Sequence, residues 1–400
     1  MSGRLLRLAC TATLAAQAVL VPLPAAAAPE PGGRPVAALL TDLQRLYRDA
    51  EKATETFNAT EERLKRQRAE VARLDRALAR ARLALHDSRG AAGRLARQQY
   101  QGSTDISPYV RLLLARDPQH ALDQGHVIGR LARGRAATVR ELSDGERRAD
   151  ALARRARAAL DRQLTLAERH RRAKDDVRDR LNAVQRTLAS LSAEQLTALA
   201  EFERKGIARA QRRFMASGAV GRTARTPSRA GERALRHAVR QLGKPYAWGA
   251  EGPASYDCSG LTQRAWERAG TPIPRTSQEQ WARLTRVPLE ELRPGDLVVY
   301  FPEATHVALY LGDGLVVHAP RPGARVKVSP VAANPVLGAV RPDPDAAPLP
   351  RYTPPELPEG ARAGSDEGYA APAADAPGEG RTADAPRADQ APDAPETSMR

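Results

Sequence analysis

Cys258 and two histidines are the residues whose types and spacing indicate covalent chemistry. Cys258 lies in the run Tyr256-Asp257-Cys258-Ser259-Gly260, and His306 and His318 follow it in the chain. A cysteine thiolate is a strong nucleophile, and a histidine beside it can take the thiol proton and pass it to a leaving amine. A second histidine can hold the ring of the first. This set predicts a thiol active site.

The elements around Cys258 predict where its sulfur lies. Leu261, Ala265 and Trp266 follow it at helical spacing, so Cys258 falls in the first turn of a helix. Backbone N–H groups and the helix dipole at that position favour the thiolate over the thiol. The alternative is a small buried apolar residue, which is common for a free cysteine.

The two histidines are predicted to lie on a β-hairpin. Residues 306–311 and 315–318 have the composition of strands, and Gly312-Asp313-Gly314 lies between them. A three-residue loop with Gly314 at a bulge would place His306 and His318 on one face, whereas a two-residue turn would separate them. The catalytic interpretation requires the three-residue loop. Zinc is a competing interpretation, but the close Cys/His pairs of structural zinc sites are missing. We therefore expect no metal or other cofactor.

The N-terminus predicts export. Arg4 and Arg7 precede an apolar run, and small residues at 25–28 suit cleavage, so residues 1–28 have the features of a signal peptide. Cys10 would be removed with this segment rather than carry a lipid. Cys258 would then be the sole cysteine of a secreted protein, located at the cell wall or the extracellular face of the envelope.

Long helical patterns fill the region between the signal peptide and the thiol. Apolar residues recur at heptad spacing from Leu39 to Leu95, and a second helical stretch runs from about Leu131 to Phe214. Two such helices joined by a compact tip should pack antiparallel. We therefore expect an all-α coiled-coil hairpin over residues 36–216.

The remaining chain divides by composition. Residues 217–229 form a Gly- and Pro-containing linker, and residues 230–342 form a compact α+β domain with a small antiparallel sheet. Residues 343–400 are rich in Pro, Ala and Asp and poor in large apolar side chains, so they are expected to be disordered.

The chain is strongly basic, with a net charge of +16 over 400 residues. This charge indicates either attraction to an anionic polymer or arginines that only coat solvated helices, and composition leaves both open. The sequence shows no zinc-finger spacing, recognition helix or aromatic-interleaved basic sheet, so nucleic acid is not an expected partner.

Several motifs of the compact domain together resemble one family of enzymes. Their order resembles that of the NlpC family, papain-like cysteine peptidases that cut the stem peptides of bacterial peptidoglycan. The motifs are Gly243-Lys244-Pro245-Tyr246-Ala247-Trp248-Gly249, Asp257-Cys258-Ser259-Gly260, Pro274-Arg275-Thr276-Ser277, Pro294-Gly295-Asp296-Leu297, His306-Val307-Ala308-Leu309-Tyr310-Leu311-Gly312 and His318-Ala319.

The resemblance implies a role for each matching residue. Cys258 is the nucleophile, His306 the base and His318 the polar third member in this reading. The resemblance also implies that five residues contact the reacting peptide, with Tyr246 stabilising the oxyanion: Tyr246, Trp248, Asp257, Ser259 and Arg275. Ala250 replaces the usual second glycine after Trp248-Gly249, which alters the loop where substrate would approach closely.

The resemblance further implies cleavage between D-glutamate and the diamino acid, in wall remodelling or cell separation. An exported member with an N-terminal coiled coil is similar to actinobacterial secreted hydrolases, in which the helices hold the peptidase inactive or dock it on a membrane division complex. Two alternatives stay open: a catalytically silent wall-binding scaffold or activator of another hydrolase, and an amidase or acyl-transfer reaction on the same fold. The intact Cys258, His306 and His318 favour the enzyme, and Arg275 favours a charged peptide substrate.

Overall fold

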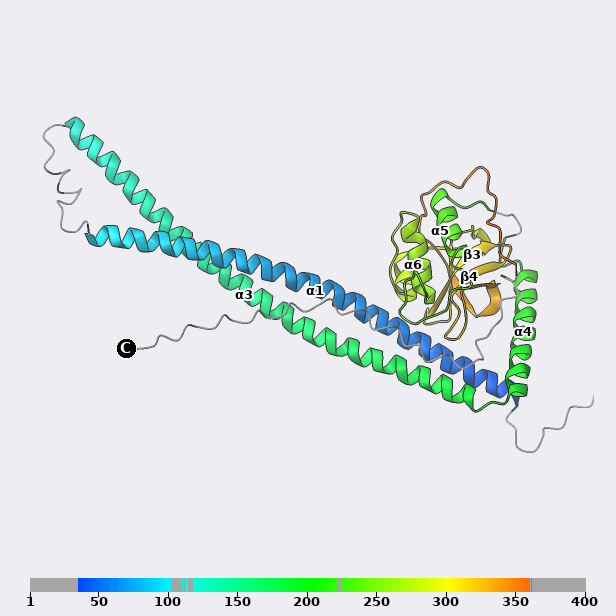
Figure 1. Cartoon of the computed structure of the whole chain (residues 1–400). Coiled ribbons are helices and arrows are strands. Elements are labelled where there is room, and N and C mark those ends of the chain that lie inside the picture. Colours follow the sequence, from blue (N-terminus) through cyan, green and yellow to red (C-terminus); the bar gives the residue numbers. More distant parts are fainter. Residues whose placement is uncertain are drawn as a thin grey trace, which may run out of the picture.

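The structure is a computed structural model that describes residues 35–101, 110, 113, 118–221, 225–359 and 361. It consists of a long helical hairpin and an α+β domain that lies beside one end of it (Figure 1). The predicted division into these two parts is confirmed. The predicted signal peptide with Cys10, most of the tip of the hairpin, and the chain after residue 361 lie outside the described residues.

Two long helices form the arms of the hairpin. α1 (Val36–Gln101) and α3 (Pro118–Ala189) run antiparallel and bury successive layers of apolar side chains. Leu43 packs in one cluster with Leu188, and Leu74 packs in another with Ala159. The heptad spacing explains this packing, because residues three and four apart lie on one face of a helix. No helix in the described ranges is apolar over a stretch long enough to cross a bilayer.

The second helical stretch is broken near its end. The prediction of one helix continuing to Phe214 is wrong, because α3 ends at Ala189 and α4 (Ala193–Ala216) begins a new direction along the α+β domain (Figure 1). Ser192 caps α4 by accepting the backbone N–H of Gln195 at 3.2 Å, and the Gln195 side chain accepts the Ser192 N–H at 2.9 Å. This reciprocal pair is a capping box, a recognisable start signal.

A six-stranded antiparallel sheet, in the order β1-β6-β2-β3-β4-β5, forms the centre of the α+β domain. Helices α5 (Arg229–Val239) and α6 (Cys258–Arg268) pack on one face, and Phe214 of α4 packs against the other. The short helix α7 (Ser277–Arg283) and two 3₁₀ turns, η2 (Leu289–Glu291) and η3 (Val331–Ala333), complete the domain. The strands are β1 (Thr285–Val287), β2 (Leu297–Tyr300), β3 (His306–Gly312), β4 (Leu315–His318), β5 (Lys327–Pro330) and β6 (Val336–Arg341).

The chain on either side of the predicted domain also lies against it. The Leu349 N–H donates to the Pro227 carbonyl at 2.8 Å, and the Thr226 hydroxyl donates to the Leu349 carbonyl at 2.6 Å. Tyr352 and Leu357 pack on the domain core. The predicted disordered tail therefore differs from the structure over residues 343–359, because these few large apolar side chains find a surface to cover.

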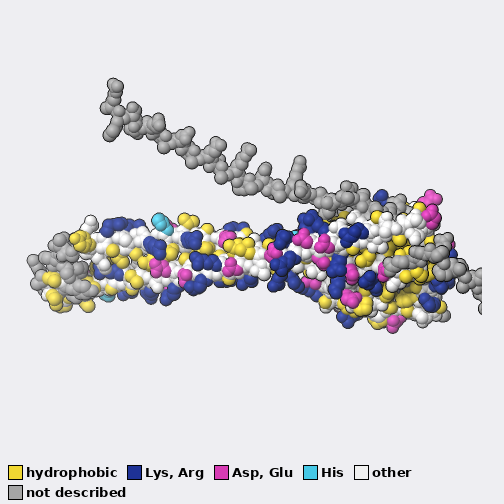
Figure 2. All heavy atoms as spheres, turned by 90° about the horizontal axis from the view of Figure 1, so that it is seen from below, with side chains coloured by type: hydrophobic (Ala, Val, Ile, Leu, Met, Phe, Trp, Pro, Cys, Tyr) yellow, Lys and Arg dark blue, Asp and Glu magenta, His cyan; other side chains and the backbone are white. Residues whose placement is uncertain are grey.

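Basic and acidic side chains are mixed along the hairpin. On the face seen in Figure 2, Asp and Glu groups are scattered among more numerous Lys and Arg groups, with hydrophobic side chains between them. Several form pairs within one helix, such as Arg73 with Glu70 at 2.7 Å. This distribution favours the interpretation of the arginines as solvated helix surface over a concentrated polyanion site.

Candidate active site

The turn between β3 and β4 is the shorter of the two that the sequence left open. Asp313 and Gly314 form a two-residue turn, both with positive φ (50° and 71°), and the expectation that such a turn separates the two histidines is wrong. The strand register shifts between Tyr310 and Gly312, which marks a bulge just before the turn. A bulge adds one residue to one strand and reverses the alternation of side chains beyond it.

The bulge compensates for the shorter turn. β3 and β4 pair Leu309 with Val317 and therefore place His318 across from Ala308, two residues from His306. The two histidines consequently share a face, as the catalytic interpretation requires. Nε2 of His306 lies 2.8 Å from Nδ1 of His318.

Cys258 is brought to the same place by the start of α6. It is the first residue of that helix, and the Asp257 side chain caps the helix by accepting the Gly260 N–H at 2.7 Å. The backbone N–H of Val307, the residue after His306, hydrogen-bonds the sulfur. The structure thus brings the three predicted catalytic residues together, and all three side chains are buried.

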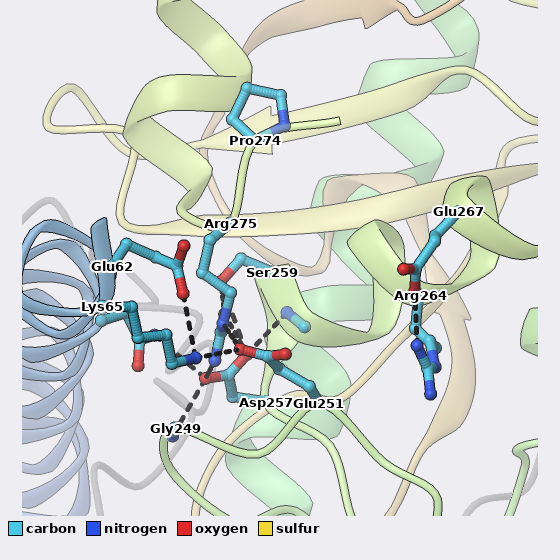
Figure 3. Close-up of polar contacts among 12 residues, drawn as sticks. Glu62, Lys65, Gly249, Glu251, Asp257, Ser259, Arg264, Glu267, Pro274 and Arg275 are labelled. Carbon is cyan, nitrogen blue, oxygen red and sulfur yellow. Dashed lines mark hydrogen bonds and ion pairs between the residues drawn. The ribbon is translucent and has the colours of Figure 1, made fainter. Parts of the chain in front are cut away.

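Arg275 connects two other predicted substrate-binding residues, Asp257 and Ser259 (Figure 3). Its guanidinium donates to both carboxylate oxygens of Asp257, at 3.1 and 2.7 Å, and to the Ser259 hydroxyl at 2.8 Å. A third nitrogen donates to Glu251 at 2.8 Å. Burial would lower the pKa of Arg275, but the charge of Asp257 and their hydrogen bond raise it on balance. The guanidinium therefore stays charged and holds this side of the site in place.

Tyr246 and Trp248 lie on the loop before α6 and pack with the core cluster that contains Cys258. Burial raises the pKa of Tyr246 well above its usual value, and the charge of Cys258 acts in the same direction. The phenol is therefore a neutral hydroxyl able to donate. Trp248 makes an edge contact with Phe57 of α1, with ring centroids 5.0 Å apart. The position where Trp248 is expected to meet a peptide is thus covered by the hairpin.

Helix α1 also places a carboxylate in the site, which the sequence analysis missed. Glu55 accepts from the Ser259 hydroxyl at 2.7 Å and from the Ser277 backbone N–H at 2.8 Å. The same carboxylate lies 3.9 Å from the Cys258 sulfur. Glu55 is almost fully buried. It occupies the space directly beside the nucleophile.

Two further α1 residues complete this contact. The Glu51 carboxylate lies 3.3 Å from Nδ1 of His306, and the Asn58 amide donates to Asp257 at 3.0 Å. Glu51, Glu55 and Asn58 are spaced four and three residues apart, so they share one face of α1. This polar stripe beside the heptad seam is the signal that could have indicated a buried contact.

The hairpin changes the chemistry of the thiol. Burial raises the pKa of Cys258 well above its usual value, and the charges of Glu55, Asp257 and Glu51 raise it further. The Val307 N–H lowers it, but these other effects outweigh it. The predicted acidic thiol is therefore not found in this arrangement, because desolvation and nearby carboxylates disfavour the thiolate more than the helix start favours it.

Glu55 is itself perturbed by its position. Burial raises its pKa from 4.5 to about 7, and the charge of Asp257 adds to this, while Arg275 and the hydrogen bonds from Ser259 and Ser277 oppose it. Glu55 therefore takes up a proton near neutral pH when α1 lies in the site.

The competing zinc interpretation gains no support. Within the described parts of the chain, no group of three or more His, Cys, Asp and Glu side chains is arranged to hold a metal ion. The facing nitrogens of His306 and His318 bind each other instead of pointing to a shared centre.

Comparison with known proteins identifies the relatives of the α+β domain. Residues 243–338 match the model of the NlpC/P60 family. Over 79 residues the chain is 51% identical to the protein named Probable endopeptidase Cgl2188 of Corynebacterium glutamicum, covering 20% of this chain and 38% of that protein. Over 105 residues it is 40% identical to Probable endopeptidase Mb2213c of Mycobacterium bovis, covering 26% and 27%. The match thus spans between about a quarter and two fifths of these relatives.

Two solved structures are similar to part of the chain. The NlpC/p60 domain of the peptidoglycan hydrolase SagA is 32% identical, with 28% of this chain and 97% of that chain covered and a TM-score of 0.27. RipD of Mycobacterium tuberculosis, titled a non-catalytic NlpC/p60 domain protein adapted to peptidoglycan binding, is also 32% identical, with 29% and 98% covered and a TM-score of 0.26.

Proposed function

We propose that this chain, which carries an NlpC/P60 domain at residues 243–338, is a secreted cysteine endopeptidase that cuts the stem peptides of bacterial peptidoglycan. The observation that carries the proposal is the assembly of the Cys258 sulfur and the hydrogen-bonded pair His306 and His318 at one end of the sheet. Relatives named probable endopeptidases support the same class of hydrolase.

The site residues suit acyl transfer through a thioester. His306 takes the thiol proton, and the Cys258 sulfur attacks the peptide carbonyl carbon while the Tyr246 hydroxyl donates to the developing oxyanion. His306 then gives its proton to the departing amine. Water attacks the thioester and restores the thiol. His318 holds the His306 ring through both steps.

The substrate preference is inferred from the carboxylate now in the site. Glu55 is held by the Ser259 hydroxyl and the Ser277 N–H, with the Arg275 charge nearby. A carboxylate of the stem peptide would find the same donors beside the sulfur. This chemistry supports cleavage of the bond between D-glutamate and the diamino acid, because D-glutamate brings a free carboxylate close to the peptide bond that is cut.

The hairpin is proposed to hold this peptidase inactive. Glu51, Glu55 and Asn58 fill the space that a substrate needs, and Phe57 covers Trp248. A helix tethered to the domain has a high effective concentration for its own site, so it competes well with peptides from outside. Helix α4 adds a second attachment, because Glu203 pairs with Arg321 through two contacts of 3.0 and 3.1 Å.

Two alternatives make different predictions. A wall-binding scaffold or an activator of another hydrolase would not need a reactive Cys258 thiol. It would also not need Glu55 to leave its position beside the sulfur. An amidase or acyl-transfer reaction would use the same Cys258 but release other products. The rate and the products of sacculus hydrolysis distinguish both alternatives from the peptidase. Docking of the hairpin on a membrane division complex is compatible with the peptidase and would provide the event that lifts α1.

The products of sacculus digestion test the function directly. We define the opened chain as the full-length protein with Glu55→Lys, which places a cation beside Arg275 and removes the acceptor of Ser259 and Ser277. Mass spectrometry of fragments released by the opened chain should show peptides ending in D-glutamate and new amino groups on the diamino acid. Fragments cut at the sugar–peptide amide would instead establish an amidase, and sacculi bound but uncut would establish a scaffold.

The docking of α1 should depend on pH through Glu55. Its pKa is about 7 when docked and is expected to be near 4.5 when free, so docking takes up a proton. The stabilisation of the docked state by protonated Glu55 is fully present below about pH 4.5 and is lost as pH rises through about 7. Full-length hydrolysis, divided by that of the opened chain at each pH, should therefore rise between pH 5 and pH 7.5. With Glu55→Gln the ratio should stay level over this range, and a level ratio in the unmodified chain would contradict the assignment.

A further inference from the structure

Three side chains form a hydrogen-bonded row across neighbouring strands of the sheet. Nε2 of His306 on β3 lies 2.8 Å from Nδ1 of His318 on β4, and Nε2 of His318 lies 2.9 Å from Oγ of Ser329 on β5. Ser329 pairs with Val316, two residues before His318, so the two side chains leave the same face. Ser329 is only 6% exposed, so bulk water has little access to this end of the row.

The ring protons of the two histidines can be arranged in two ways, which give the row two opposite hydrogen-bond directions. In the first, His318 accepts at Nδ1, so the His306 proton sits on Nε2 and its Nδ1 lone pair is free. In the second, His318 donates from Nδ1, so neutral His306 carries its proton on Nδ1 and cannot take another there. Only the first direction lets His306 act as a base through Nδ1.

The hydrogen bond between His318 and Ser329 has opposite donors in the two arrangements. Burial lowers the pKa of His318 well below its usual value, and the positive charges of His306, Lys327 and Arg321 act in the same direction, so His318 is neutral and holds one ring proton. In the first direction this proton is on Nε2 and requires an acceptor. Among the described residues, the hydrogen-bond partner of that nitrogen is the Ser329 oxygen.

We propose that Ser329 is a positioning residue whose hydroxyl oxygen accepts the Nε2–H of His318 and thereby keeps Nδ1 of His306 available to the Cys258 thiol. The inference rests on the proposed function in one respect, namely that Cys258 is the group activated. When the thiol proton moves to Nδ1 of His306, the resulting imidazolium keeps the same direction, and each member of the row donates to the next. Ser329 thus stabilises the charged pair as well as the tautomer.

Several charged groups face the row and the thiol and could also affect how alkylation depends on pH. Glu51 from α1 faces Nδ1 of His306, and Glu55 and Asp257 act on the sulfur. Lys327 and Arg321 act on His318. Glu51 would itself favour a proton on Nδ1 of His306, and the acidic groups from α1 leave with the hairpin, so the test is made in the opened chain.

A matched pair of substitutions isolates the hydroxyl. Ser329→Thr retains it and Ser329→Val replaces it with a methyl group in the same shape, so any steric effect is common to both. Alkylation of Cys258 by iodoacetamide is measured against pH in the opened chain and followed at that residue by peptide mass spectrometry. We expect Ser329→Thr to stay within about twofold of the parent, and Ser329→Val to be about tenfold slower at pH 7, with half-maximal rate about one pH unit higher.

A second measurement does not depend on activity. In the opened chain with ¹⁵N-labelled histidine, in which Glu51 has left Nδ1 of His306, the ring nitrogens of His318 should show a protonated Nε2 and an unprotonated Nδ1. Ser329→Val should change this pattern and Ser329→Thr should not. Ser228→Ala serves as control, because Ser228 is a buried serine that caps α5 and makes no contact with the row.

The outcomes separate this inference from the proposed function. Equal alkylation profiles and equal histidine spectra for Ser329→Val and Ser329→Thr would overturn the role of Ser329. A protonated Nδ1 on His318 in the parent would overturn it as well. An opened chain that leaves sacculi intact, yet shows the expected difference between the two variants, would retain the hydrogen-bonded row and refute the peptidase.

Discussion

The opened chain, with Glu55→Lys, is expected to hydrolyse purified sacculi at least about thirtyfold faster than the unmodified full-length chain. Truncating one partner of a buried charged hydrogen bond at an interface costs about 2–5 kcal/mol, and a reversed charge beside Arg275 adds repulsion. Lysine also cannot accept from Ser259 or Ser277. The gain in rate reports the fraction of chains from which α1 has left the site.

Glu70→Lys is the matched control for this experiment. Glu70 lies on the same helix but pairs with Arg73 of its own helix at the surface. The same charge change there should leave hydrolysis within about twofold of the unmodified chain, since surface pairs contribute about 0–1 kcal/mol. Equal rates for Glu55→Lys and the unmodified chain would show that α1 does not limit access, and equal acceleration by both substitutions would show a general effect of charge.

Replacing the nucleophile should have the largest effect of all. In the opened chain, Cys258→Ala is expected to lower hydrolysis of sacculi by about 10⁴-fold or more, to the background of the assay. His306→Ala should lose nearly as much, because residues that act as a unit are not additive. The measurement is the rate of release of soluble fragments, with folding checked by circular dichroism.

His86→Ala provides the comparison for the histidine substitution. His86 is an exposed residue of α1, so its loss should leave the rate of the opened chain unchanged. Hydrolysis that survives in Cys258→Ala would exclude the thioester mechanism. A chain that supports cell separation equally well with and without Cys258 would instead establish the scaffold.

The sequence by itself determined the parts of this protein that depend on local pattern. Heptad spacing predicted two antiparallel helices, and the spacing after Cys258 placed the thiol at a helix start. Ordered motifs predicted the family of the α+β domain and named Cys258, His306 and His318 as a set. Such features rest on residues near one another in the chain, where periodicity and capping preferences are strong.

Only the tertiary structure decided how these parts meet. The two histidines share a face because a bulge before Asp313 offsets the two-residue turn, which alone would separate them. Turn type and bulge are set together by strand pairing. Glu55 reaches Ser259 across 204 residues of sequence, a contact that no local pattern encodes. The same contact explains why a cysteine at a helix start has a raised pKa rather than a lowered one, because burial and carboxylates from a distant helix outweigh the local dipole.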